Sequence, residues 1–179
     1  MYETRPEPSE YAPFYASYVA RVPAGDLIEI LGLQGALTQR LLAPLDEARA
    51  LHRYAPSKWS VKEVIGHLAD GERVFAYRAL RFARADETPL PGFDEQKWVP
   101  AGGFDRRPLA TLLAELAAVR AATRAQFTGF DPAAWLRRGT ANNNPVSVRA
   151  LAAIIAGHEL HHVAILRERY GVGEAGVGR

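Results

Sequence analysis

Three of the five histidines in this 179-residue chain fall within one short stretch near its C-terminal end, residues 157–162. Apolar residues recur around this stretch at helical spacing. At about 100° per residue, His158 and His162 lie near the centre of the apolar stripe, one turn apart, whereas Glu159 and His161 lie at its opposite edges. The sequence therefore predicts a helix that directs two imidazoles into the interior of the protein.

Two histidines four residues apart on a helix can bind one metal ion, because their Cβ atoms are about 6 Å apart. Buried rings without partners would cost about 1–3 kcal/mol for each unsatisfied nitrogen, and a metal ion satisfies one nitrogen on each ring. The alternative is a pair of core histidines that hydrogen-bond to helix or loop groups. A third ligand would have to come from another helix, and His67 is the candidate, although alone it would be interpreted as an ordinary boundary histidine. His52, in a loop, is not expected to bind a metal.

The same stretch matches the letters H-E-x-x-H, a signature in which the glutamate acts as general base on a zinc-bound water. The extended form of that signature needs a glycine and a third histidine downstream, where this chain has Ile165 and Glu168. No strand is predicted that could align a peptide substrate. The pattern therefore argues against a protease.

Apolar periodicity predicts four helices that form an all-α fold, a four-helix bundle. They are expected at residues 26–42, 60–84, 108–127 and 147–170. Ser60 and Glu63 fit a capping box, Ser147 is the expected cap of the last helix, and Gly171 is its expected C′ residue. The predicted apolar face of the first helix consists of Leu27, Ile30, Leu31, Leu33, Leu37 and Leu41, and that of the third consists of Leu109, Leu112, Leu113, Leu116 and Val119.

The connections are read from glycine, proline and asparagine. The segment 89–107 is expected to be a long loop rich in aromatic residues, and loops of this length often carry function or shield a site. A short helical turn is expected at 131–135 and a tight turn at 142–145, with no alternating strand. The predicted organisation is a lead-in segment at 1–23, one helical domain at 24–171 and a flexible tail at 172–179.

Composition excludes several classes of protein. The chain has no cysteine, which excludes disulfides, thiolate ligands and cysteine nucleophiles, so a metal site must use histidine nitrogen and carboxylate oxygen. Net charge is only +2, and the basic residues are neither clustered nor interleaved with aromatic residues, so nucleic acid is not an expected partner. No apolar run approaches the roughly 18 residues that cross a bilayer, and the N-terminus lacks the apolar region of a signal peptide. A cytoplasmic protein without a membrane partner is expected.

Three stretches together resemble the DinB/YfiT-like superfamily of bacterial four-helix bundles, over residues 24–171. They are residues 59–70, which contain Trp-Ser-x-x-Glu-x-x-x-His; residues 92–98, with Gly-Phe-Asp-Glu before Trp98; and residues 157–168, with the late His-x-x-x-His. The joint occurrence of the first and the last pattern carries the resemblance.

The resemblance implies an up-down bundle with an unusual order of connections, which is frequently a homodimer. It implies that one histidine of the second helix and two of the fourth bind a divalent metal ion, commonly nickel or zinc. His67, His158 and His162 occupy those positions. Some members of the wider family are transferases or hydrolases that use low-molecular-weight bacterial thiols, which implies a small-molecule substrate. The alternatives are a non-catalytic metal-binding or stress-response protein and a bundle that binds no metal.

Three neutral imidazoles leave at least one metal coordination position open, where a bound thiol or water can lose its proton near neutral pH. A chain without cysteine could then use a nucleophile that arrives with the substrate. Glu63 and Asp70 are candidates to accept the ring N–H of His67, although helix capping and a solvated charge also explain them. Asp94 and Glu95 either line the mouth of a pocket or form a surface turn, and Trp59 and Trp98 are expected to be packing residues.

Overall fold

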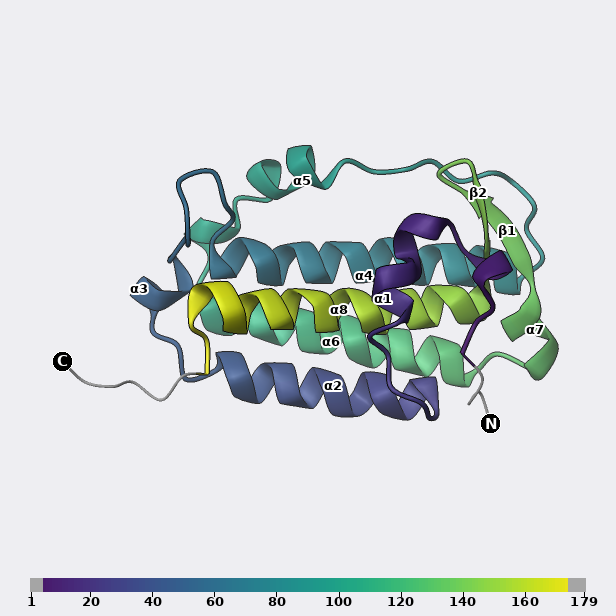
Figure 1. The fold of residues 1–179 in the computed structure, drawn as a ribbon, viewed down its shortest axis with the longest axis horizontal. Helices are drawn as coiled ribbons and strands as arrows, with labels where there is room; N and C mark the ends of the chain where they lie inside the picture. The colour runs from purple at the N-terminus through teal and green to yellow at the C-terminus, as the bar shows by residue number, and fades with distance from the viewer. Residues whose placement is uncertain (1–4, 174–179) are drawn as a thin grey trace.

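Four long helices form the body of the protein in the computed structural model, which describes residues 5–173. They are α2 (Leu27–Leu42), α4 (Val61–Ala83), α6 (Leu109–Thr128) and α8 (Val148–Tyr170). Helices α2 and α4 each pack against both α6 and α8, so α2 and α4 face each other across the bundle. Figure 1 shows α2 and α8 running in one direction and α4 and α6 in the other. The predicted all-α four-helix bundle is confirmed, and its consecutive helices are not all neighbours.

Short elements connect the long helices. The 3₁₀ turns are η1 (Pro8–Glu10), η2 (Pro13–Tyr15) and η3 (Phe104–Arg106), and the short helices are α1 (Ala16–Val19), α3 (Glu47–Ala50), α5 (Glu95–Gly102) and α7 (Pro132–Leu136). Helix α5 lies in the segment that was expected to be a loop. Among the described residues, no helix is both long and apolar enough to span a bilayer.

The predicted ends of the helices agree with the structure. The Glu63 backbone N–H donates to Ser60 Oγ (3.0 Å), and the Ser60 N–H donates to the Glu63 carboxylate (2.9 Å), which completes the capping box of α4. Ser147 caps α8 with a single bond, in which its Oγ accepts the Ala150 N–H (3.0 Å). Gly171, with a φ of +64°, ends α8 in the left-handed conformation that glycine adopts without strain.

A β-hairpin precedes α8, and the sequence did not predict it. Strands β1 (Arg138–Ala141) and β2 (Asn144–Ser147) pair antiparallel around a two-residue turn. Asn142 and Asn143 have φ values of +50° and +60°, as a tight hairpin turn requires at both central positions. The turn was identified from its asparagines, but strands of four residues are too short to show an alternating pattern.

The inward face of α2 differs from the prediction. Leu33 and Leu37 are 68% and 58% exposed, whereas Gln34 and Thr38 are buried. The Gln34 side-chain amide donates to the Ala156 carbonyl oxygen of α8 (2.9 Å) and to the Glu159 carboxylate. Because this polar residue faces the interior, the helix is rotated relative to a phase read from its leucines alone.

A buried polar layer crosses the bundle, with one residue from each long helix: Gln34, Glu72, Arg120 and Glu159. The Arg120 guanidinium donates two hydrogen bonds to the Glu72 carboxylate (2.9 and 2.8 Å) and lies 2.9 Å from a Glu159 oxygen. Burial acts to lower the pKa of Arg120, but the two carboxylates outweigh it and raise that pKa. Glu159, expected at the edge of the apolar stripe, is therefore in the core.

The segment before α2 is fixed to the start of α8. The buried Glu10 carboxylate accepts hydrogen bonds from Ser147 Oγ (2.6 Å) and from Arg149 Nε (2.8 Å). Burial acts to raise the pKa of Glu10, but the bonds to Arg149 and Ser147 lower it to about 2.

Of the segment expected to be a flexible tail, Val172 is buried, and its N–H donates to the Leu166 carbonyl oxygen (3.0 Å). Residues 174–179, like residues 1–4 of the expected lead-in, lie outside the described residues.

Candidate metal centre

The structure brings the three histidines of the sequence analysis together. His67 comes from α4, and His158 and His162 come from successive turns of α8. One ring nitrogen from each lies within 4.8 Å of the other two, and His67 Nε2 is 2.8 Å from His158 Nε2. All three side chains are at least nine-tenths buried. In the described part of the chain, this is the one cluster of three or more such side chains with metal-binding spacing.

Two glycines of α4 make room at this position. A Cβ atom at Gly71 would lie 3.1 Å from His158 Cε1, so the absence of a side chain lets the His158 ring approach α4. A Cβ atom at Gly66 would lie 2.3 Å from the ring of Phe104, which packs beneath the first turns of α4. The close approach of the His158 ring to α4 therefore depends on Gly71, and that of the Phe104 ring depends on Gly66.

Burial keeps the three rings neutral. It lowers the pKa of His67 to about 4 and, together with the nearby rings of His67 and His161, lowers that of His162 to about 3. Burial and the neighbouring histidines lower the pKa of His158 well below its ordinary value. Neutral imidazoles present free lone pairs at pH 7, and a set of three nitrogen ligands suits zinc, nickel or copper rather than calcium or magnesium. The donor set therefore fits a divalent transition metal.

The carboxylates considered as partners for His67 have other roles. Glu63 accepts the Ser60 N–H and pairs with Arg53, and Asp70 lies 3.4 Å from Arg73. Within residues 5–173, neither carboxylate is hydrogen-bonded to His67. Capping explains Glu63, and an ion pair with Arg73 explains Asp70.

Aromatic side chains surround the histidines. The Trp59 ring packs against His67 and His162, with ring centroids 4.8 and 6.4 Å apart. His161 is half-buried against Tyr18 (5.2 Å), outside the cluster. His52 packs against Tyr170 (6.2 Å) and is likewise outside it. Trp98, 44% exposed, packs on Phe93.

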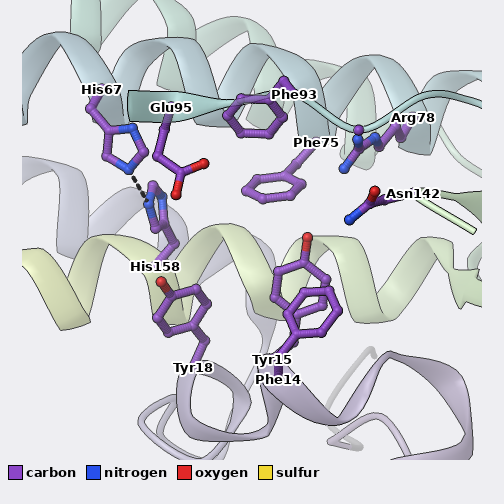
Figure 2. Close-up of a pocket in the computed structure, with 11 residues that line it drawn as sticks. Phe14, Tyr15, Tyr18, His67, Phe75, Arg78, Phe93, Glu95, Asn142 and His158 are labelled. Atoms are coloured by element: carbon purple, nitrogen blue, oxygen red, sulfur yellow. Dashed lines mark hydrogen bonds between the residues drawn. The ribbon is translucent and has the colours of Figure 1, made fainter. Parts of the chain in front are cut away.

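A cavity of about 370 Å³ leads to His67 and His158. Figure 2 shows these two rings at one end of it and Arg78 and Asn142 at the other. Five parts of the chain supply its lining: Phe14, Tyr15 and Tyr18 before α2; His67, Phe75 and Arg78 from α4; Gly92, Phe93 and Glu95 around the start of α5; Asn142 from the hairpin turn; and His158 from α8. Residues 92, 93 and 95 of the segment predicted to be a loop therefore line this cavity.

Glu95 and Asp94 separate into two roles. Glu95 lines the cavity, and Figure 2 shows its carboxylate directed inward near His158. Asp94 accepts the Gln96 N–H and caps α5, as expected for a surface turn.

A second cavity of about 180 Å³, lined in part by Trp59 and Tyr170, opens on His162. The histidine cluster is therefore reached from two cavities.

Comparison with known proteins gives one family and one fold. A model of the DinB superfamily matches residues 31–166. A protein of Oceanobacillus iheyensis named as a "putative metal-dependent hydrolase" is 26% identical over 154 residues, which cover 82% of this chain and 87% of that protein. A Bacillus licheniformis protein with the same form of name is 31% identical over 138 residues, which cover 73% and 76%.

Two solved structures share the fold. YfiT from Bacillus subtilis, described as "a probable metal-dependent hydrolase with an unusual four-helix bundle topology", has a TM-score of 0.73 at 19% identity and covers 92% of this chain and 95% of its own. A mycothiol-dependent maleylpyruvate isomerase has a TM-score of 0.67 at 16% identity, over 82% of this chain and 60% of the isomerase.

Proposed function

Because the chain belongs to the DinB superfamily, we propose that it is a metal-dependent transferase or hydrolase. In this proposal the protein uses a low-molecular-weight thiol to act on a small-molecule substrate. One observation carries the proposal: three neutral histidines form one cluster, and two of them, His67 and His158, line a cavity of about 370 Å³. The names of the relatives from O. iheyensis and B. licheniformis support metal dependence and hydrolysis. The mycothiol dependence of a protein with the same fold supports a thiol.

His67, His158 and His162 are the proposed ligands, and nickel or zinc is the proposed metal. When bound, such an ion supplies Lewis-acid activation of a thiol or water near neutral pH. The chain has no cysteine, so a thiol nucleophile would have to enter with the substrate. The cavity beside His67 and His158 offers such a thiol a path to the proposed ligands.

The other residues of the cavity have two proposed roles, to exclude water from the histidines and to accept a proton. Tyr15, Tyr18 and Phe75 place rings around the approach to His158, which excludes water from it. The Glu95 carboxylate, which points into the same cavity as His158, is assigned the role of accepting a proton from the nucleophile. On the opposite side, the Trp59 ring packs on His67 and His162 and lines the second cavity.

A homodimer is also proposed, with α2 as its contact. Leu33 and Leu37 lie one turn apart on the outside of that helix and are 68% and 58% exposed. Sedimentation of the wild type and of the Leu33→Lys/Leu37→Lys variant tests this contact. A wild-type monomer, or a variant that remains dimeric, would refute it.

Metal content is the first test of the function. Mass spectrometry of untagged, dialysed protein is expected to give about one nickel or zinc ion per chain, lost in the His158→Ala/His162→Ala variant. The loaded protein is then assayed with coenzyme A, glutathione, mycothiol and bacillithiol, by the rate at which each thiol reacts with chlorobimane. Absence of metal after reloading would refute the metal site, whereas bound metal without thiol turnover would favour the non-catalytic alternative.

A further inference from the structure

Arg78 is a buried arginine without a carboxylate partner in the described part of the chain. Its residue is 3% exposed, and its guanidinium donates to the Pro91 carbonyl oxygen (2.7 Å). Its Cζ atom lies 5.7 Å from the centre of the Phe75 ring and 5.9 Å from that of Phe93. The other fully buried guanidinium in residues 5–173, that of Arg120, is paired with two glutamates. Arg78 therefore lacks the compensation that Arg120 has.

A buried charge without a counter-charge is costly. A guanidinium offers five N–H donors, of which the Pro91 carbonyl oxygen and the Tyr15 phenol take only part. Burial lowers the pKa of Arg78, and the adjacent Tyr15 phenol opposes that shift. The Arg78 side chain lines the cavity, so an anion that enters can supply the missing partner. Buried, unpaired guanidinium groups in a cavity are typical of sites that bind a carboxylate or phosphate through two parallel hydrogen bonds.

Arg78 lies at one end of the cavity of about 370 Å³. Figure 2 shows Asn142 beside Arg78, at the end of the cavity opposite the histidines. Gly92 is small enough to leave the Asn142 amide in place, because a Cβ atom at Gly92 would lie 2.5 Å from Asn142 Oδ1. Arg78 follows His67 by eleven residues on α4, which is about 16 Å along the helix axis. The rings of Phe75 and Phe93 line the space between the two ends.

We propose that Arg78, with Asn142 beside it, binds a carboxylate group of an elongated small molecule whose reacting end lies at the histidines. The placement of the reacting end rests on the proposed function, whereas the anion site at Arg78 does not. The bond between guanidinium and carboxylate fixes one end of the ligand, and the aromatic walls contact its apolar middle.

Charge favours a carboxylate over a phosphate. Among the described residues that line the cavity, Arg78 is the one cationic side chain and Glu95 is the one carboxylate. A singly charged ligand group is neutralised by Arg78, while a dianionic phosphate would keep a negative charge in a cavity that already holds Glu95. Octyl phosphate is therefore expected to bind no more tightly than octanoate.

Octanoate is the probe for the anion site, because it has a carboxylate and an apolar chain but no thiol. Isothermal titration calorimetry on the protein as purified, and again after treatment with a chelator, is expected to show saturable binding in both. Octanamide is expected to bind about thirtyfold more weakly or not at all. Failure of octanoate to bind would overturn the proposal, whether or not the protein holds a metal.

Substitution of Arg78 and of a control arginine that directly follows α4 makes the test specific. Arg78→Met keeps the length and packing of the side chain and is expected to weaken octanoate binding about thirtyfold or more. Arg84→Met is the matched control, because Arg84 packs over Phe130, outside the cavity, and octanoate binding should be unchanged. If Arg78→Met does not fold, Arg78→Lys retains the charge but not the paired donors and is expected to bind about tenfold more weakly. Equal binding by the Arg78 variants and the wild type would overturn the proposal.

Chain length identifies the molecule that carries the carboxylate. Mercaptohexanoate, mercaptooctanoate and mercaptoundecanoate are titrated into the metal-loaded protein beside the corresponding thiol-free acids. An advantage of at least about tenfold for one thiol acid over its thiol-free acid, lost in Arg78→Met, would place both groups on the thiol. No such advantage at any length would place the carboxylate on the second substrate. A failed metal site removes the difference between thiol and thiol-free acids but leaves the octanoate result intact.

Discussion

His67 Nε2 and His158 Nε2 lie 2.8 Å apart across the interface between α4 and α8. A neutral imidazole has one donor and one acceptor nitrogen, so without a metal one of these rings donates to the other. That contact leaves His162 Nε2 or Nδ1 to complete the cluster, within 4.8 Å of both. The two helices are therefore linked by the side chains that are proposed to hold the metal.

Removal of His67 is expected to weaken the affinity for zinc by at least about 100-fold, more than the loss of an outer hydrogen-bond partner would cause. His67→Ala removes the ligand from α4 and leaves the pair on α8 in place. The measurement is competition with a chromophoric chelator. His161→Ala is the control, because His161 lies outside the cluster, and its affinity should equal that of the wild type. If His161→Ala binds as weakly as His67→Ala, the ligand set is wrong.

Acid should destabilise the metal-free protein between about pH 6.5 and pH 3. The unfolded histidines bind protons below their ordinary pKa of 6.5, while the folded pKa values are about 4 for His67 and about 3 for His162. Above pH 6.5 neither state holds these protons, so no stability is lost there. As the pH falls, the unfolded state takes them up first, and at pH 5 the cost is about 2 kcal/mol for each ring.

Urea unfolding at pH 7 and pH 5 measures this loss. The His67→Gln/His162→Gln variant, which cannot take up these protons, should lose correspondingly less stability over the same range. An equal loss in the variant and the wild type would show that other groups cause the acid sensitivity.

Arg120→Met is expected to destabilise the protein by about 3–5 kcal/mol, because it leaves the buried carboxylates of Glu72 and Glu159 without a cation. Neutralising both acids in the same chain, with Glu72→Gln and Glu159→Gln, should restore much of the loss. Urea denaturation of the single and triple variants is the measurement. A single variant as stable as the wild type would mean that the polar layer contributes no electrostatic stability.

Gly157→Ala is expected to displace the segment before α2 and to cost about 1–3 kcal/mol. A Cβ atom at Gly157 would lie 2.1 Å from the Tyr18 carbonyl oxygen, and backbone cannot move aside as a side-chain end can. Gly129→Ala is the control, because its Cβ would meet its nearest neighbour at 3.5 Å, an ordinary contact. Thermal unfolding and limited proteolysis of residues 5–22 are the measurements. Equal behaviour of the two variants would contradict this packing.

The fold was predictable where local patterns decide it. Ser60 with Glu63, and the spacing of His158 and His162, depend only on neighbours within one helical turn. Amphipathic analysis assigns apolar residues to the interior, so it predicts that Leu33 faces inward and that Glu159 lies at an edge. The polar layer reverses this on α2 and α8. That layer joins residues from four helices, and no local pattern reports such a contact.

The cavity was the least predictable part. Tyr15, Arg78 and Asn142 are far apart in sequence and belong to no shared motif. One signal was present: the length of the loop predicted at 89–107 suggested a functional or shielding role, and Glu95 was one of two residues considered for the mouth of a pocket. The residues that face Glu95 across the cavity are set by tertiary packing.

The aromatic residues of the cavity and the histidines at its end come from different parts of the chain. His67 and His158 are fixed within the bundle, whereas Tyr15, Tyr18 and Phe93 come from segments laid over it and anchored at points such as Glu10 and Arg149. Substitution in those overlying segments can therefore alter which molecules are admitted without disturbing the interior. Related bundles could diversify in this way, with the histidine cluster unchanged and the residues around the cavity exchanged.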